Sequence, residues 1–230
     1  TWSVAQTLTV DHDATGRTVA IDGSTVVVGA SAVDTGKISI LNRTGNTWSL
    51  DQEVSGFAGA SQFGSSVAVQ GGTVVAGAPS SGDPIPATGA VGFVTSAGGW
   101  TVSDVIRPSL GGGGGTSVAA GEGWAVLGAP TAWTRHGPSG IVTIAQRTAN
   151  GWTTSATVQR DAASSGDEFG ASVDIHSVGL IAARAPGQGS GAVHLVLPAG
   201  WLGTVISAPP GTSADARFGA SVSFAHNHLV

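Results

Sequence analysis

The chain has 230 residues, of which 10% are charged and 41% are hydrophobic, and its 37 glycines and low charge exclude a disordered polar chain. Its formal net charge of −5 provides no basic surface, so we expect no nucleic-acid partner. It contains no cysteine, which excludes disulfide bonds, thiolate metal sites and cysteine nucleophiles.

Five tryptophans divide the chain into units of about fifty residues. Their spacings are 46, 52, 52 and 49 residues, and they are Trp2, Trp48, Trp100, Trp152 and Trp201. Each begins a short run, such as residues 48–54, that is typical of a β-strand. A period of this length predicts a repeat fold in which each unit packs against the next.

Three more phrases recur in a fixed order between the tryptophans. The first is Phe-Gly before a β-branched run, found at 63–69, 169–173 and 218–222, with weaker copies at 15–21 and 114–120. The second is an apolar stretch that ends in Gly-Ala, found at 27–31, 75–79 and 126–130, and at 183–186 without its glycine. The third is a glycine before a short apolar run, found at 36–38, 89–91, 140–142 and 191–193. Together with the tryptophan run, these phrases predict four strands per unit and almost no helix.

Four short strands per unit predict an all-β fold, a β-propeller of four-stranded blades. A single sheet of this kind cannot bury both of its faces, whereas radial packing against similar sheets buries both and leaves short edges. We expect one domain, 1–230, with units at approximately 11–54, 55–106, 107–158 and 159–206.

A fifth blade is expected from residues 207–230 together with residues 1–10, because the two ends carry different strands of one unit. The propeller would then have about five blades. The third strand of the fifth blade is missing, and an incomplete blade exposes edges that invite pairing. We therefore expect either assembly with another chain or a fragment of a larger protein.

The order Phe-Gly, Gly-Ala-Pro, Gly-Ala-Val and Gly-Gly-Trp, clearest in residues 63–100, resembles the FG-GAP repeat. The resemblance implies an integrin-α-like propeller of the type found in secreted and surface proteins of bacteria, and thus an extracellular or cell-surface location. Several members of that family carry an Asp-x-Asp-x-Asp-Gly calcium loop after the Gly-Ala-Pro strand. Here those loops offer only Asp34 and Asp83, and calcium needs about six to eight oxygen ligands, so we expect neither a metal nor another cofactor.

Residues 131–138 form a long and varied loop and the best candidate for a ligand site. Trp133, Arg135 and His136 combine a stacking surface with cationic and hydrogen-bonding groups, which suits a sugar or a peptide. An ordinary surface loop is the alternative, because connecting loops vary freely. Trp124 is a further candidate because small residues hold its place in other units, although a packing adjustment is the simpler explanation.

Acidic residues gather just before the Phe-Gly phrases, at Asp11, Asp13, Asp161, Asp167 and Glu168. Turn formation explains them, because Asp and Ser side chains bond to the backbone of their own turns. A hydrolase or lyase would need these carboxylates to share one cleft. The chain has no Gly-x-Ser-x-Gly elbow, no His-Glu-x-x-His and no phosphate-binding glycine motif, so we expect no catalytic residues.

The sequence therefore predicts a non-enzymatic extracellular binding or adhesion module whose loops contact a glycan or a protein. One alternative is a structural assembly protein that oligomerises through its incomplete blade. Another is a hydrolase or lyase on a propeller scaffold, since fold alone does not determine function. No run of about 18 apolar residues occurs, so we expect no membrane insertion.

Overall fold

A computed structural model describes residues 3–8, 18–31, 35–81, 88–197, 202–225 and 228–230. Within these ranges the only helical element is a 3-10 turn at Ala214–Ala216. The strands form four antiparallel sheets of four strands each, together with two small hairpins. The predicted all-β fold of four-stranded blades is confirmed, and we number the sheets blades 1 to 4 in chain order.

Each blade is a meander in which strands that are consecutive in the blade pair with each other. Blade 1 consists of β1 (Thr18–Asp22), β2 (Thr25–Ala30), β3 (Lys37–Thr44) and β4 (Thr47–Ser55). Blade 2 consists of β5 (Ser66–Gln70), β6 (Thr73–Ala78), β7 (Ala90–Thr95) and β8 (Thr101–Ile106). Blade 3 consists of β9 (Ser117–Gly121), β10 (Trp124–Ala129), β13 (Ile141–Thr148) and β14 (Gly151–Val158). Blade 4 consists of β15 (Val173–Ile175), β16 (Ile181–Ala185), β17 (Ala192–Val196) and β18 (Leu202–Ser207).

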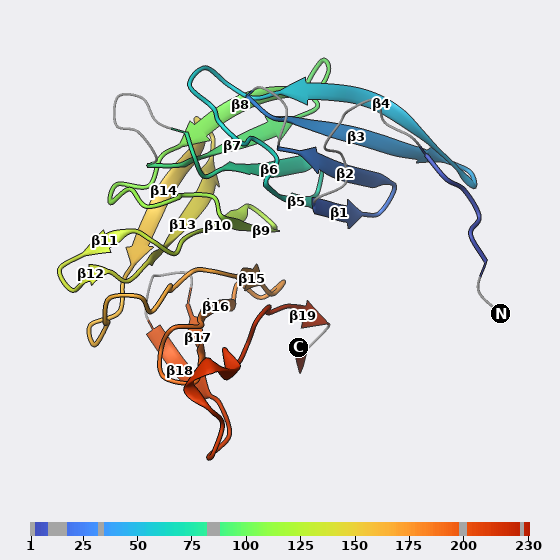
Figure 1. The fold of residues 1–230 in the computed structure, drawn as a ribbon. Coiled ribbons are helices and arrows are strands. Elements are labelled where there is room, and N and C mark those ends of the chain that lie inside the picture. Colours follow the sequence, from blue (N-terminus) through green and yellow to red (C-terminus); the bar gives the residue numbers. More distant parts are fainter. Residues whose placement is uncertain (1–2, 9–17, 32–34, 82–87, 198–201, 226–227) are drawn as a thin grey trace.

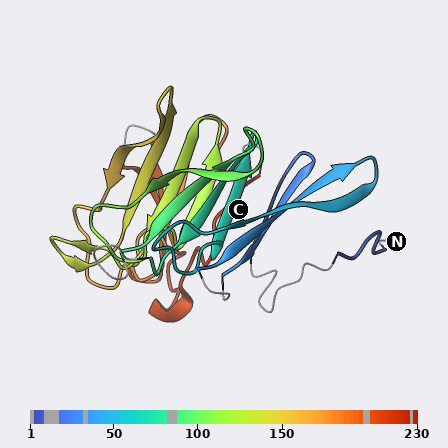
Figure 2. The same ribbon diagram turned by 90° about the horizontal axis from the view of Figure 1, so that it is seen from above.

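The two hairpins are β11 (Trp133–Thr134) with β12 (Gly137–Pro138), and β19 (Phe224–Ala225) with β20 (His228–Leu229). The blades stand around a common axis with the first strand of each blade innermost (Figure 1). β1 lies against β5, β5 against β9, and β9 against β15. Seen from above, the sheets stand side by side (Figure 2). The described chain therefore forms an open arc of blades.

Neighbouring blades are joined by a hydroxyl at the start of each innermost strand. In three successive interfaces this hydroxyl donates a hydrogen bond to the carbonyl oxygen of the glycine at the Phe-Gly position of the next blade. The three bonds are Thr18 to Gly64 (2.9 Å), Ser66 to Gly115 (2.7 Å) and Ser117 to Gly170 (2.8 Å). In blades 2 and 3 the first phrase thus contains both a donor to the next blade and an acceptor from the preceding one.

The glycine of the Gly-Ala phrase lies against the same carbonyl group. A Cβ atom at Gly128 would lie only 1.9 Å from the carbonyl oxygen of Gly170, and the equivalent distances for Gly29 and Gly77 are both 2.0 Å. Glycine is needed where two backbones approach this closely. Blade 4 carries Arg184 at this position, so its junction with the following unit is built differently.

The apolar core lies between neighbouring blades. Phe93 of blade 2 stacks on Trp152 of blade 3 with ring centroids 4.4 Å apart. Phe63, Phe93 and Phe169 are completely buried in the clusters that join successive blades. Because each blade completes the core of its neighbour, stability is shared between blades, as in other repeat proteins.

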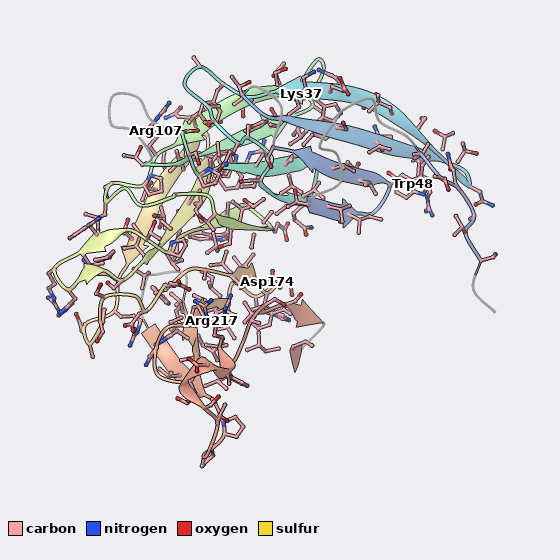
Figure 3. The ribbon with its side chains drawn as sticks, viewed as in Figure 1. Lys37, Trp48, Arg107, Asp174 and Arg217 are labelled. Carbon is pink, nitrogen blue, oxygen red and sulfur yellow. The ribbon has the colours of Figure 1, made fainter. Side chains whose placement is uncertain are left out.

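One backbone hydrogen bond between blade 4 and the fifth unit repeats a bond that joins blades 3 and 4. The backbone N–H of Phe218 donates to the carbonyl of Ser190 (2.7 Å), as that of Phe169 does to Ser139 one blade earlier (2.9 Å). Asp174 and Arg217 stand at this junction (Figure 3). In the described residues, β19 and β20 of this unit pair only with each other.

Residues 3–8 lie beside blade 1, apart from β19 and β20 in both ribbon views (Figures 1 and 2). The side-chain amide of Gln6 binds the backbone of Trp48 twice (2.7 and 2.9 Å). Gln52 makes the same two bonds to Trp100 in the next blade (2.7 and 2.8 Å). Residues 3–8 thus take the place of an outer strand that precedes blade 1, while the building of one blade from both ends of the chain remains a prediction.

Candidate functional site

The predicted ligand loop forms the β11–β12 hairpin beyond the end of β10. Trp133 is 68% exposed. The hydroxyl of Thr134 forms a 2.7 Å hydrogen bond with the buried Ser139 and accepts the backbone N–H of His136 (3.0 Å). These bonds fix the hairpin while the indole ring of Trp133 stays open to solvent.

Arg135 connects the hairpin to the loop that leads into blade 4. Its Nε donates to Nε2 of His136 (2.9 Å), and a terminal guanidinium nitrogen donates to Asp161 (2.9 Å). The N–H of Gly166 donates to the carbonyl of Pro138 (2.9 Å), which adds a backbone bond between the same two loops. The structure therefore brings the hairpin's three predicted ligand residues together on one rim, and Asp161 joins them from the next loop.

Trp124 does not belong to this group. It is the first residue of β10, whereas the β11–β12 hairpin follows the last residue of that strand, so the two lie at opposite ends of blade 3. Trp124 lines a separate cleft of about 400 Å³ between blades 2 and 3, together with Gln70, Glu122, Arg147 and Trp152. The two candidate tryptophans of the sequence thus mark two different surfaces.

Three of the described acidic residues before the Phe-Gly phrases each bind a different arginine. The pairs are Asp161 with Arg135, Asp167 with Arg160, and Glu168 with Arg217. Hydrolysis by two carboxylates needs an acid and a second carboxylate that flank one bond. Each of these three carboxylates pairs with its own arginine, and Asp11 and Asp13 lie outside the described residues.

A buried polar cluster lies where the chain enters blade 4. Arg160 and Asp167 are 6% and 4% exposed, and Asp167 also accepts the N–H of Ser164 (2.6 Å). Burial, together with the nearby Arg160, lowers the pKa of His194 to about 4, and Asp167 opposes this change. Nε2 of His194 bonds to Gln188 (2.7 Å). The ring is therefore uncharged at neutral pH, and the cluster is an internal part of blade 4.

In the ranges that the structure describes, no group of three or more histidine or acidic side chains is placed to hold a metal ion. Asp34 and Asp83, the carboxylates at the calcium-loop position, lie outside those ranges. None of the helical structure in the described chain is long and apolar enough to span a bilayer.

No protein-family model and no curated protein matches this chain. The WD40 domain of coronin from Toxoplasma gondii aligns with 86% of the chain at 13% identity and a TM-score of 0.55. A putative 6-phosphogluconolactonase from Bacteroides uniformis also aligns with 86% of it, at 12% identity and a TM-score of 0.57. The chain covers 47% and 58% of these two chains, which is about half of each. These similarities concern the fold alone, and they agree with the four-stranded sheets in giving a β-propeller.

Proposed function

We propose that the chain is a non-enzymatic binding module that presents the β11–β12 hairpin to a glycan or protein ligand outside the cell. The observation that carries this proposal is Trp133, a residue that is 68% exposed on a hairpin fixed by internal hydrogen bonds. Tryptophan is among the residues that dominate binding energy when a partner covers them. A ring held open to solvent in a fixed position is therefore suited to a ligand.

The neighbouring side chains support the same function. The bond to Asp161 and the contact with His136 hold the guanidinium of Arg135, on the same hairpin as Trp133, in place before any ligand arrives. Such preorganisation reduces the conformational entropy that binding costs. An aromatic face next to fixed hydrogen-bond donors suits a sugar ring as well as a peptide.

We further propose that the repeat is of the FG-GAP type and that the protein is secreted or displayed on a cell surface. The two glycines of the repeat together allow neighbouring blades to approach closely, because the Gly-Ala glycine of one blade lies against the Phe-Gly glycine of the next. At blades 3 and 4 these are Gly128 and Gly170. This contact gives a physical reason for the recurrence of both phrases in the same order.

Trp133→Ala should weaken binding of the hairpin's ligand at least about tenfold, because the indole ring supplies the central contact. The measurement is a screen of the whole chain against a glycan array and against immobilised extracellular-matrix proteins, followed by titration of each hit with both variants. The fold should be unchanged, since the side chain is mostly exposed.

Val178→Ala is the matched control, because Val178 is 78% exposed and lies outside the hairpin. It should bind every hit as tightly as the unmodified chain does. The proposal is wrong if the screen yields no ligand, or if Trp133→Ala retains full affinity for all of them.

Self-association is a second candidate function, favoured by the uncovered face of blade 1. Val19 and Ile21 are 68% and 64% exposed, whereas Val69, which holds the place of Ile21 in blade 2, is 8% exposed because blade 1 covers it. Apolar side chains on an open sheet face are typical of an interface.

Ile21→Lys should shift the chain from a defined oligomer to a monomer if this face joins two copies. A buried lysine without a partner would strongly disfavour the interface. Light scattering over a concentration series measures the mass, with Val178→Lys as the control that should leave it unchanged. A monomer at every concentration of the unmodified chain would exclude assembly.

A further inference from the structure

The interface of blades 2 and 3 lacks a hydrogen bond that closes the interface of blades 1 and 2 at the rim opposite the β11–β12 hairpin. Asp22, the last residue of β1, accepts the N–H of Gly71 in blade 2 (2.7 Å). Gln70 holds the place of Asp22 in blade 2, and within the described chain it forms no such bond to blade 3. The cleft of about 400 Å³ opens at this point.

An unsatisfied hydrogen-bond donor lies at the same cleft. Trp152 lines the cleft and is 8% exposed, and its indole N–H has no partner among the described residues. The equivalent Trp100 donates its indole N–H to Asp51 of the preceding blade (2.9 Å). Ser103 holds the place of Asp51 in blade 2, since each is the third residue after a tryptophan and lies at the bulge of an outer strand. A buried donor without an acceptor is costly, so a molecule that brings an oxygen atom is favoured here.

Trp124 gives this cleft an aromatic wall that blades 1 and 2 lack, because threonines begin the equivalent strands there. Its side chain is half-buried and therefore keeps part of its surface open. Glu122 and Arg147 are exposed at the cleft, and the ion pairs found in the described residues include neither of them. Gln70 adds an uncharged amide, so the lining offers donors and acceptors beside an aromatic face.

We infer that this cleft binds a neutral carbohydrate, as a second site separate from the hairpin. A sugar ring has an apolar face that stacks on Trp124 and hydroxyl oxygens that accept from the N–H of Trp152. One acidic and one basic side chain give the lining no net charge, which favours an uncharged ligand over an anion or a cation. The volume lies within the range of small-molecule sites. This inference does not depend on the function proposed for Trp133.

The indole N–H resonance of Trp152 is the direct readout. It is assigned by its loss in Trp152→Phe and followed by nitrogen–proton NMR as glucose, galactose, mannose, N-acetylglucosamine, maltose or cellobiose is added at millimolar concentration. At least one of these sugars should shift the resonance downfield in a saturable manner, because the N–H gains an acceptor. An acidic peptide and inorganic phosphate are titrated in parallel.

Ser103→Asp tests the unsatisfied donor, because it gives Trp152 a carboxylate at the position from which Asp51 binds Trp100 one blade earlier. In this variant the resonance should already be shifted without sugar, and sugar affinity should fall at least about tenfold. Trp124→Ala should lower the affinity by a similar factor, whereas Trp133→Ala should leave it unchanged. The inference is overturned if none of the sugars moves the resonance, or if the acidic peptide or phosphate moves it and the sugars do not.

Discussion

Gly128→Ala should lower the free energy of unfolding by about 4 kcal/mol, which is more than overpacking usually costs. The new Cβ atom would lie 1.9 Å from the carbonyl oxygen of Gly170 and 2.3 Å from the hydroxyl of Ser117. The first obstacle is backbone and cannot rotate aside, so blades 3 and 4 must move apart. Their separation also opens the core around Phe169, which is completely buried. Urea denaturation of the two variants measures the difference.

Gly123→Ala is the matched control in the same blade. Gly123 has a positive φ of 70°, and a Cβ atom there would meet nothing within 4 Å. Its substitution should cost about 1 kcal/mol, from backbone strain alone. If Gly128→Ala costs no more than Gly123→Ala, the close approach of the two blades is not a determinant of stability.

Most of the blade architecture could be predicted from the sequence because each repeated phrase makes the same contact in several of the units. Gly77 and Gly128 recur since a neighbouring carbonyl leaves no room for a side chain. Gln6 and Gln52 recur at the same distance from a tryptophan because each binds the backbone of the next blade. A contact that recurs between blades requires the same residue type at the same place in each repeat. This pattern can be detected in a single sequence without knowledge of the contact.

The Trp133 hairpin was only partly predictable. The loop and its residue types are visible in the sequence, but Asp161 lies 26 residues beyond Arg135, and nothing in a single sequence pairs them. The pairing follows from the propeller, which places the loop after one strand beside the loop that leads into the next blade. Trp124 could be recognised as unusual, but its position at the opposite end of β10 became clear only with the strand boundaries.

The cleft at Trp124 could not be predicted, because it results from interactions that are missing. Ser103 and Gln70 are unremarkable residues in the sequence. They acquire meaning when compared with Asp51 and Asp22, which bind the next blade at the equivalent places. A single sequence shows which residue is present, whereas the loss of a contact is seen only when the equivalent contact is known.

Asp167→Asn should lower the free energy of unfolding by about 3–5 kcal/mol, the usual cost of removing one partner from a buried ion pair. Asp167 and Arg160 are 4% and 6% exposed, so the guanidinium would remain buried without a counter-charge. Asparagine keeps an oxygen for the N–H of Ser164, which limits the change to the loss of charge. Urea denaturation at pH 7 measures the effect.

Asp161→Asn is the control, because the side chain of Asp161 is 94% exposed and its ion pair with Arg135 lies at the surface. It should change stability by less than about 1 kcal/mol, as exposed ion pairs do. Arg160→Met combined with Asp167→Asn should recover much of the loss, since no unpaired charge then remains buried. If the double variant is as unstable as the sum of the two single variants, the two side chains do not act as a pair. If Asp161→Asn costs as much as Asp167→Asn, burial is not the source of the effect.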